Sequence, residues 1–317
     1  MLDILVITGP IYLCIAVGYL TTRLGVFARD DRRVFGKFVI NVAAPALLCK
    51  ALAERPIGEI LNVGYILAYL AGTFAVGGLG FLWCRLRRMD RTSSALAVMG
   101  MACSNSVFIG YPLILLAAPS AAGLSMALNA LIENFVVTPL LLALAESGRV
   151  ASGRWYRVLG RSLLRLFANP IIVALVCGFA ISLLGWKLPE FVSRTLGLFA
   201  VGTGGLSLFV IGGTLAGLPL RGAMQRVAPI VVAKLVFHPL AVFLALLALP
   251  ALGVPPVEPA LKTAAVLMAA VPMMAIYPIL AQIFGQEDMS ATALLLATAA
   301  SFFTLSALLW MLAAVPA

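Results

Sequence analysis

The sequence contains little charge. Asp, Glu, Lys and Arg together make up 11% of its 317 residues, while 63% of the residues are hydrophobic. A soluble domain has about a quarter charged and about half apolar residues, because it needs a polar exterior in water. The composition therefore excludes a water-soluble globular fold and indicates an integral membrane protein.

Residues that carry catalytic or metal chemistry are also scarce. The chain has one His, and its five Cys form no C-x-x-C pair, so we interpret the Cys as small buried hydrophobes and predict no metal site. It has no G-x-x-x-x-G-K-[ST] phosphate loop, so the sequence predicts no ATP-hydrolysing site of its own to power transport. Because no nucleophile, base and orienting group occur together, we predict no enzyme and no cofactor beyond coupling to H⁺ or Na⁺.

Long apolar runs are abundant. A helix rises about 1.5 Å per residue and the hydrocarbon core is about 30 Å thick, so a span needs about 20 apolar residues. The sequence predicts an all-α membrane protein with ten spans, at 3–22, 35–53, 61–84, 94–118, 121–145, 165–185, 195–217, 227–249, 260–284 and 289–314.

The basic residues lie mainly in loops on one side of these spans. Of the 22 Lys and Arg, 16 belong to the loops 23–34, 85–93, 146–164 and 218–226 or their flanks. The positive-inside rule then places these loops in the cytoplasm and both termini outside. The net charge of +10 is therefore explained by loops that face anionic lipid, and we predict no nucleic-acid partner. The N-terminus lacks a basic n-region, so we interpret the first span as retained rather than as a cleaved signal.

Two short patterns recur once in each half. Gly9-Pro10 in the first span matches Asn169-Pro170 in the sixth, and Tyr111-Pro112 in the fourth matches Tyr277-Pro278 in the ninth. Five spans per half is an odd number, so the second half must enter the membrane inverted. Such repeats are typical of secondary transporters, although channels use them too. We predict a first repeat at 1–145, a cytoplasmic linker at 146–164 and a second repeat at 165–317.

The fourth and ninth spans are interrupted by Pro, Gly and polar residues. Either these are simple proline kinks, or both helices break, and broken helices at matching places indicate a transporter binding site. Half-helices that begin near Pro112 and Pro278 would direct free N–H groups and positive dipole ends at the membrane centre, which favours an anion. The candidate substrate-binding residues are Ser104, Asn105, Ser106, Gly110, Tyr111, Pro112, Pro272, Met273, Tyr277 and Pro278, together with Asn41 in the second span.

Three ionisable residues lie inside other spans. Glu133 is in the fifth, and Lys234 and His238 are four residues apart in the eighth, so they share a helix face. Charge at membrane depth is costly and usually faces a partner or water. Either Glu133 pairs with Lys234 as a structural ion pair, or these residues couple a proton or an ion to transport.

The crossover segment Ser104-Asn105-Ser106-Val107-Phe108-Ile109-Gly110-Tyr111-Pro112 resembles that of the auxin efflux carrier family, including its bacterial members. The similarity extends to the stretches 38–48, 131–134 and 234–239 and covers essentially the whole chain. The resemblance implies a ten-helix fold like that of bile-acid sodium symporters, with a scaffold domain that forms a homodimer and a transport domain that carries the broken helices.

The same resemblance implies a small organic anion as substrate, which is auxin in plants and malonate or a similar carboxylate in bacteria. By position, Asn105, Pro112 and Pro278 would border the substrate. Met273 and Met274 depart from the plant pattern, which argues against auxin. We therefore expect an elevator-like carrier of a small carboxylate in a bacterial inner membrane. An anion channel and a non-transporting receptor are the alternatives.

Overall fold

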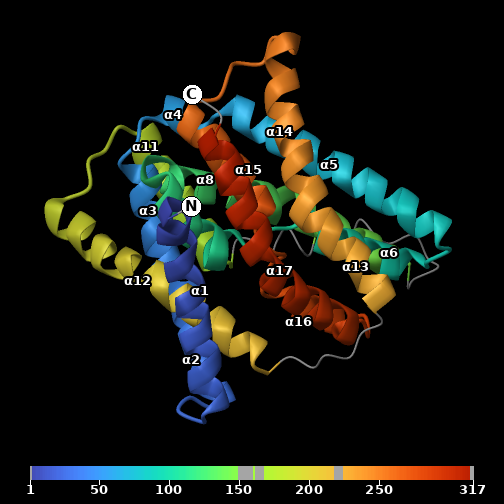
Figure 1. Cartoon of the computed structure of the whole chain (residues 1–317). Helices are drawn as coiled ribbons and strands as arrows, with labels where there is room; N and C mark the ends of the chain where they lie inside the picture. Colours follow the sequence, from blue (N-terminus) through green and yellow to red (C-terminus); the bar gives the residue numbers. More distant parts are fainter. Residues whose placement is uncertain (1, 149–159, 161–167, 218–223, 315–317) are drawn as a thin grey trace.

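The computed structural model describes residues 2–148, 160, 168–217 and 224–314, and none of these residues forms a β-strand. Four of the elements, η1 to η4, are π-helical turns, and η5 is a 3-10 turn. The elements, which Figure 1 shows in order, are α1 (Leu2–Arg23), α2 (Arg29–Phe38), η1 (Val39–Ala43), α3 (Ala44–Ala53), α4 (Ile57–Ile60), α5 (Val63–Leu86), α6 (Arg91–Ala102), η2 (Ser106–Gly110), α7 (Tyr111–Ala117), α8 (Pro119–Ile132), η3 (Glu133–Val137), α9 (Thr138–Ser147), α11 (Pro170–Leu183), α12 (Glu190–Leu215), α13 (Met224–Val232), η4 (Ala233–Phe237), α14 (His238–Ala248), η5 (Leu249–Leu252), α15 (Pro259–Ala270), α16 (Tyr277–Gln282) and α17 (Glu287–Ala314).

Among the described residues, eight helices are long and apolar enough to cross a membrane. Two shorter apolar helices, α11 and α15, lie where the sixth and ninth spans are predicted. The prediction of an all-α membrane protein is confirmed, while the inverted ten-helix repeat stays a prediction. Most of the predicted linker 146–164 falls outside the described residues.

The helices pack into two groups. In the first, α1 contacts α12, and α3 contacts both α11 and α12. Glycines allow a close approach between α1 and α12: a Cβ atom on Gly212 would lie 1.9 Å from the Ile15 carbonyl oxygen, and one on Gly18 would lie 2.1 Å from that of Phe209. Membrane helices associate largely through such close packing, because lipid is as apolar as their side chains.

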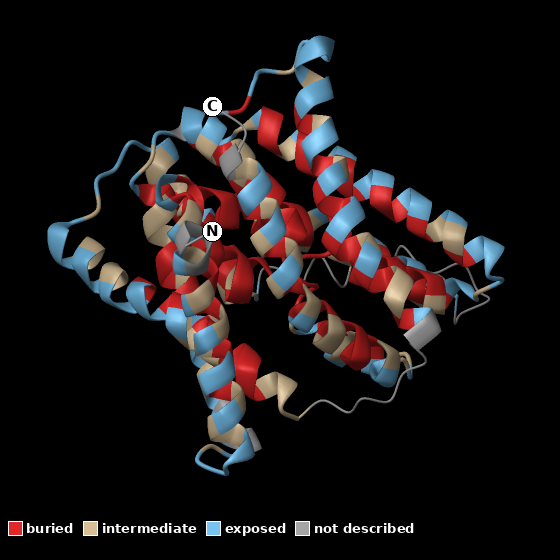
Figure 2. Cartoon of the chain, in the orientation of Figure 1, coloured by how far each residue is buried: buried red, intermediate tan, exposed pale blue. Residues whose placement is uncertain are grey.

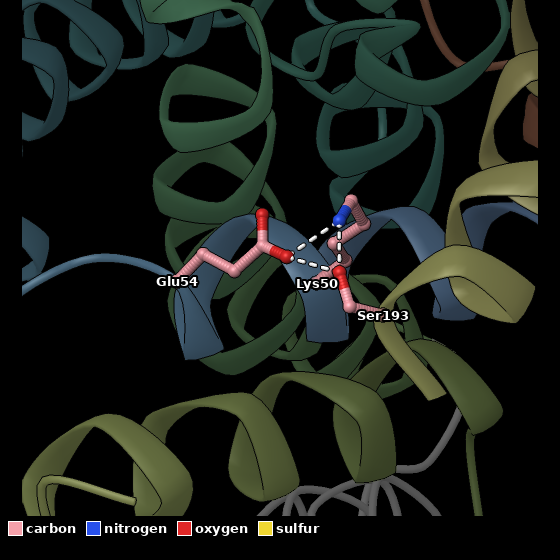
Figure 3. Close-up of polar contacts among 3 residues, drawn as sticks. All are labelled: Lys50, Glu54 and Ser193. Carbon is pink, nitrogen blue, oxygen red and sulfur yellow. Dashed lines mark hydrogen bonds and ion pairs between the residues drawn. The ribbon is translucent and has the colours of Figure 1, made fainter. Parts of the chain in front are cut away.

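A polar contact also joins α3 to α12 at one end of this group. Lys50 donates to the Glu54 carboxylate and to the Ser193 hydroxyl at 2.5 Å each, and Ser193 donates to Glu54 at 2.6 Å (Figure 3). Partial burial raises the pKa of Glu54, but the hydrogen bonds from Lys50 and Ser193 outweigh it and hold that pKa below its usual value.

The second group contains α5 to α9 and α13 to α17. In it α5 contacts α14 and α6, α6 contacts α9, and α15 packs against α8 and α14. Figure 2 shows buried residues concentrated in the middle of the molecule, with exposed residues along the outer faces of the peripheral helices. The segment Arg91–Ala117 is the most enclosed of the long spans, with 89% of its apolar window buried, whereas the other seven have 22% to 56%. The interrupted fourth span therefore lies at the centre of the protein.

Each of the π turns η1 to η4 ends two residues before a proline, at Pro45, Pro112, Pro139 and Pro239. In each, the residue before the proline donates its N–H to a carbonyl five residues back, as Tyr111 does to Ser106. A proline ring has no N–H and clashes with the carbonyl four residues earlier. A wider π turn relieves that clash without ending the helix. Turns of this kind are frequent at functional sites.

Candidate functional site

The broken parts of the fourth and ninth spans meet. Helical geometry stops at Cys103–Asn105 and at Val271–Ile276, and the Asn105 N–H donates to the Pro272 carbonyl at 2.9 Å. Two breaks, rather than two simple kinks, are present. The first lies earlier than predicted, because the helix resumes at Ser106 and the π turn η2 absorbs Pro112. The second half-helix, α16, begins at Tyr277, close to the predicted Pro278.

Asn105 is buried at this meeting point, with 3% of its surface exposed. Its Oδ1 atom caps η2 by accepting from the Phe108 N–H at 3.3 Å. Its Nδ2 amide is also buried, and the described residues offer it no hydrogen-bond partner. An unpaired buried donor costs about 1–3 kcal/mol, so a buried polar group of this kind needs an explanation. An acceptor supplied by a bound solute would provide one.

A carboxylate lies on one side of the breaks. Glu133, the first residue of η3, accepts from the Ser104 N–H at 2.7 Å and from the Ser106 hydroxyl at 3.3 Å. The Ser106 hydroxyl in turn accepts from Asn129 at 3.4 Å. Asn129 accepts from the Tyr65 hydroxyl at 2.8 Å. The acid thus fixes the backbone of the fourth-span break.

An amine lies on the other side. Lys234 in η4 is fully buried and donates to the Ser104 hydroxyl at 2.6 Å, to the Ala269 carbonyl at 2.8 Å and to His238 Nδ1 at 2.8 Å. With Nδ1 as the acceptor, a neutral imidazole carries its proton on Nε2. That atom lies 3.0 Å from the Thr73 hydroxyl and can donate to it.

Ser104 links the two charged residues. Its N–H contacts Glu133 and its hydroxyl contacts Lys234, and the hydroxyl also lies 2.9 Å from that of Tyr69. The ion pairs among the described residues join other partners, so Glu133 and Lys234 do not form a direct pair. A backbone amide and a hydroxyl of the crossover stand between them.

The remaining predicted residues have different positions. Gly110 packs against the ninth span, where an added Cβ atom would lie 2.5 Å from the Met268 sulfur. Tyr277 is buried, but its hydroxyl donates to the Leu96 carbonyl at 2.9 Å and so faces α6. Tyr111 and Met273 are also buried. Asn41 is exposed and donates to the Lys37 carbonyl, so the structure does not bring it into the cluster.

Four members of the cluster were missed in the sequence. Tyr65, Tyr69 and Thr73 lie four residues apart along α5, and Asn129 lies one turn before Glu133 on α8. The four-residue spacing of hydroxyl groups inside an apolar span is a signal that could have identified this face of α5. This face of α5 also makes two aromatic contacts, a parallel stack of Tyr65 on Tyr69 and an edge contact of Tyr69 with His238.

The cluster contains one unpaired buried donor, Asn105 Nδ2, and no set of metal ligands among the described residues. Within the described ranges, no group of three His, Cys, Asp or Glu side chains could hold a metal ion. A buried amine, an unpaired amide and the two half-helix starts form a polar centre in an otherwise apolar interior.

Comparisons with known proteins show the family of the chain. The family described as "Membrane transport protein" matches residues 5–311. A protein of Rhizobium meliloti (strain 1021) named "Putative malonate transporter" is 30% identical over 316 residues, which is 96% of each chain. An "Uncharacterized transporter YfdV" of Escherichia coli (strain K12) is 27% identical over 240 residues, 74% of this chain and 76% of that one.

Proposed function

Because the chain belongs to the auxin efflux carrier family of membrane transport proteins, we propose that it is a secondary transporter for a small organic anion, with malonate or a similar carboxylate as the solute. The similar Rhizobium protein is named for malonate. The site supports a compact acceptor, since its donors are few and lie close together around the two breaks.

The unpaired Asn105 Nδ2 group is the observation that carries this proposal. It lies at the contact between the two breaks, and the buried Lys234 donates to the neighbouring Ser104. A carboxylate oxygen beside Asn105 would accept from Nδ2 and would gain from the positive ends of the half-helices.

An elevator-like movement fits the way the helices pack. The contact of α1 with α12 has a counterpart in that of α11 with α3, and the contact of α5 with α6 has one in that of α14 with α15. These correspondences support two inverted repeats. We propose that the second helix group carries the solute past the first group. The residues of the cluster are buried in this structure, which favours alternating access over an open channel.

The proposal extends to the setting of the protein. The basic loops would face the cytoplasm of a bacterial cell and both termini the periplasm, as the positive-inside rule indicates. A homodimer would form through the first helix group, as the family resemblance implies. Coupling to H⁺ or Na⁺ would involve the cluster of Glu133, Lys234 and His238.

Uptake of malonate into proteoliposomes, with and without proton and sodium gradients, tests the proposal. Asn105→Ala removes one hydrogen bond to a charged group, worth about 1.5–3 kcal/mol, so the apparent affinity should fall about 10- to 100-fold. Asn134→Ala is the matched control, because its amide donates to the Ala130 carbonyl within its own helix. The absence of saturable uptake of any dicarboxylate would contradict a carrier, and flux that never saturates would indicate a channel.

A further inference from the structure

A large cleft lies in the second helix group, apart from the polar cluster. It has a volume of about 1530 Å³ and is bounded by the C-terminal half of α5, by α6, by α13 with η4, and by the start of α17. Figure 1 shows where these helices lie. Residues of α1, α3, α11 and α12 do not line it. A path between the two helix groups would be lined by both, so this cleft has a different use.

The inner part of the cleft is apolar. Its walls there are Val76, Leu79, Met101, Val232, Ala233 and Phe237. Leu79 is 63% exposed and Phe237 51% exposed, and both belong to membrane-spanning segments. A small dicarboxylate would lose its hydration here without gaining a hydrogen bond. The volume also exceeds the roughly 300–1,000 Å³ of most small-ligand sites, so an elongated apolar ligand fits better.

The mouth of the cleft is charged. Arg87, Arg88 and Arg226 line it, and none of them takes part in the ion pairs of the described residues. The acids at the mouth are Asp90, which caps the start of α6, and Glu287 and Asp288 in the first turn of α17. Helix dipoles partly offset the charge of acids in such positions. The three arginines are exposed and make no ion pair with these acids, so they are available for an anion.

From this arrangement we propose that the cleft binds an anionic phospholipid. Its phosphate contacts Arg87 and Arg226, because the guanidinium fork matches phosphate geometry, and an acyl chain runs inward along Leu79 and Phe237. Basic pockets between helices at the membrane surface are suited to lipid head groups.

Such a lipid would also lie next to the polar cluster. Ala233 and Phe237 on the cleft wall directly adjoin Lys234 and His238 in the sequence, and Val76 lies one turn after Thr73. A bound acyl chain would pack against this wall of the already buried cluster. The lipid is thus a structural ligand of the second helix group, and its binding does not depend on the proposed transport function.

Native mass spectrometry of the purified full chain tests this proposal. The probes are phosphatidylglycerol, phosphatidylcholine with the same acyl chains, and inorganic phosphate. The wild-type protein should retain phosphatidylglycerol preferentially. Arg87→Gln with Arg226→Gln should lower that retention roughly 30-fold, since each of the two guanidinium groups that line the cleft mouth would contribute about fivefold through its contact with the phosphate. Arg85→Gln is the matched control, because Arg85 lies on the same helix and does not line the cleft.

A second pair of variants tests the acyl chain. Leu79→Trp fills the inner cleft and should also reduce retention, whereas Leu82→Trp, another exposed position of α5 that does not line the cleft, should not. Equal retention of both lipids by the wild-type protein would overturn the proposal. So would equal loss in the Arg85 and Leu82 controls. Displacement of the lipid by inorganic phosphate alone would point to a phosphate site without an acyl chain and would also overturn it.

Discussion

Replacing Lys234 with Met removes the amine of the buried cluster while keeping a similar side-chain length. Three hydrogen bonds of 2.6, 2.8 and 2.8 Å disappear. Ser104 keeps a partner in Tyr69, but the Ala269 carbonyl at the end of α15 loses its side-chain donor. A hydrogen bond to a charged group contributes about 1.5–3 kcal/mol, and we expect the loss of these bonds to cost at least about 3 kcal/mol.

The loss should depend on Glu133, because the remaining buried acid then has no cation nearby. Glu133→Gln added to Lys234→Met should restore part of the stability, with a coupling energy of about 0.5–3 kcal/mol. Unfolding in mixed micelles, followed by tryptophan fluorescence, measures each variant. Lys262→Met is the control, because Lys262 is a partly exposed lysine in the first turn of α15. As a surface substitution it should change the free energy of unfolding by only about 0.5 kcal/mol.

Equal destabilisation by Lys234→Met and Lys262→Met would refute the reasoning, since it would mean that the three contacts of Lys234 contribute nothing. Purely additive effects of the Lys234 and Glu133 substitutions would refute the coupling through Ser104.

Three further predictions concern packing, movement and a helix cap. Gly212→Ala should destabilise the α1–α12 contact by about 1–3 kcal/mol or more through overpacking. Gly205→Ala, where an added Cβ atom meets nothing within 4 Å, should cause no destabilisation in the same unfolding assay, because Ala favours a helix more than Gly does. Tyr12→Phe removes the 2.9 Å contact with Ser301 that joins α1 to α17, so it should change the rate of solute uptake more than its affinity, and unchanged kinetics would argue against movement at this contact. Asp90→Ala removes an N-cap and should lower the free energy of unfolding by about 1 kcal/mol. Hydrogen bonds from the Ser93 side chain and backbone lower the pKa of Asp90, so the stability difference between wild type and variant should be complete at neutral pH and should shrink as the pH falls below about 3.9. A stability difference that does not change with pH would contradict this prediction.

The sequence predicted the fold best from its long apolar runs and from the prolines within them. The apolar runs predicted an all-helical membrane protein, and Pro272 and Pro278 marked the second break because proline cannot continue a helix. Pro112 was misleading for the same reason. A π turn accommodates it, and the actual break at Cys103–Asn105 contains no proline. Local sequence rules show where a proline disturbs a helix, but whether a π turn accommodates that proline depends on tertiary packing.

The polar cluster was predicted only in part. Ser104, Ser106, Glu133 and Lys234 were identified because charge and polarity are rare in apolar spans. Their connection through Ser104 depends on contacts that reach 130 residues along the chain, from Ser104 to Lys234. The bond from Asn105 to Pro272 likewise joins two distant segments. No local pattern specifies such a contact. Asn41 was chosen by the same rarity argument, and its exposed position shows that rarity alone does not place a residue in a site.

The link between Glu133 and Lys234 has an electrical consequence. One acid and one amine share the cluster, so the pair has zero net charge whichever of them holds the proton. Moving one elementary charge across the membrane involves about 2.3 kcal/mol per 100 mV. In the proposed movement, the return of the empty carrier would therefore move no net charge of this pair through the membrane potential. The potential would then act mainly on the charge of the solute and of any ion that travels with it.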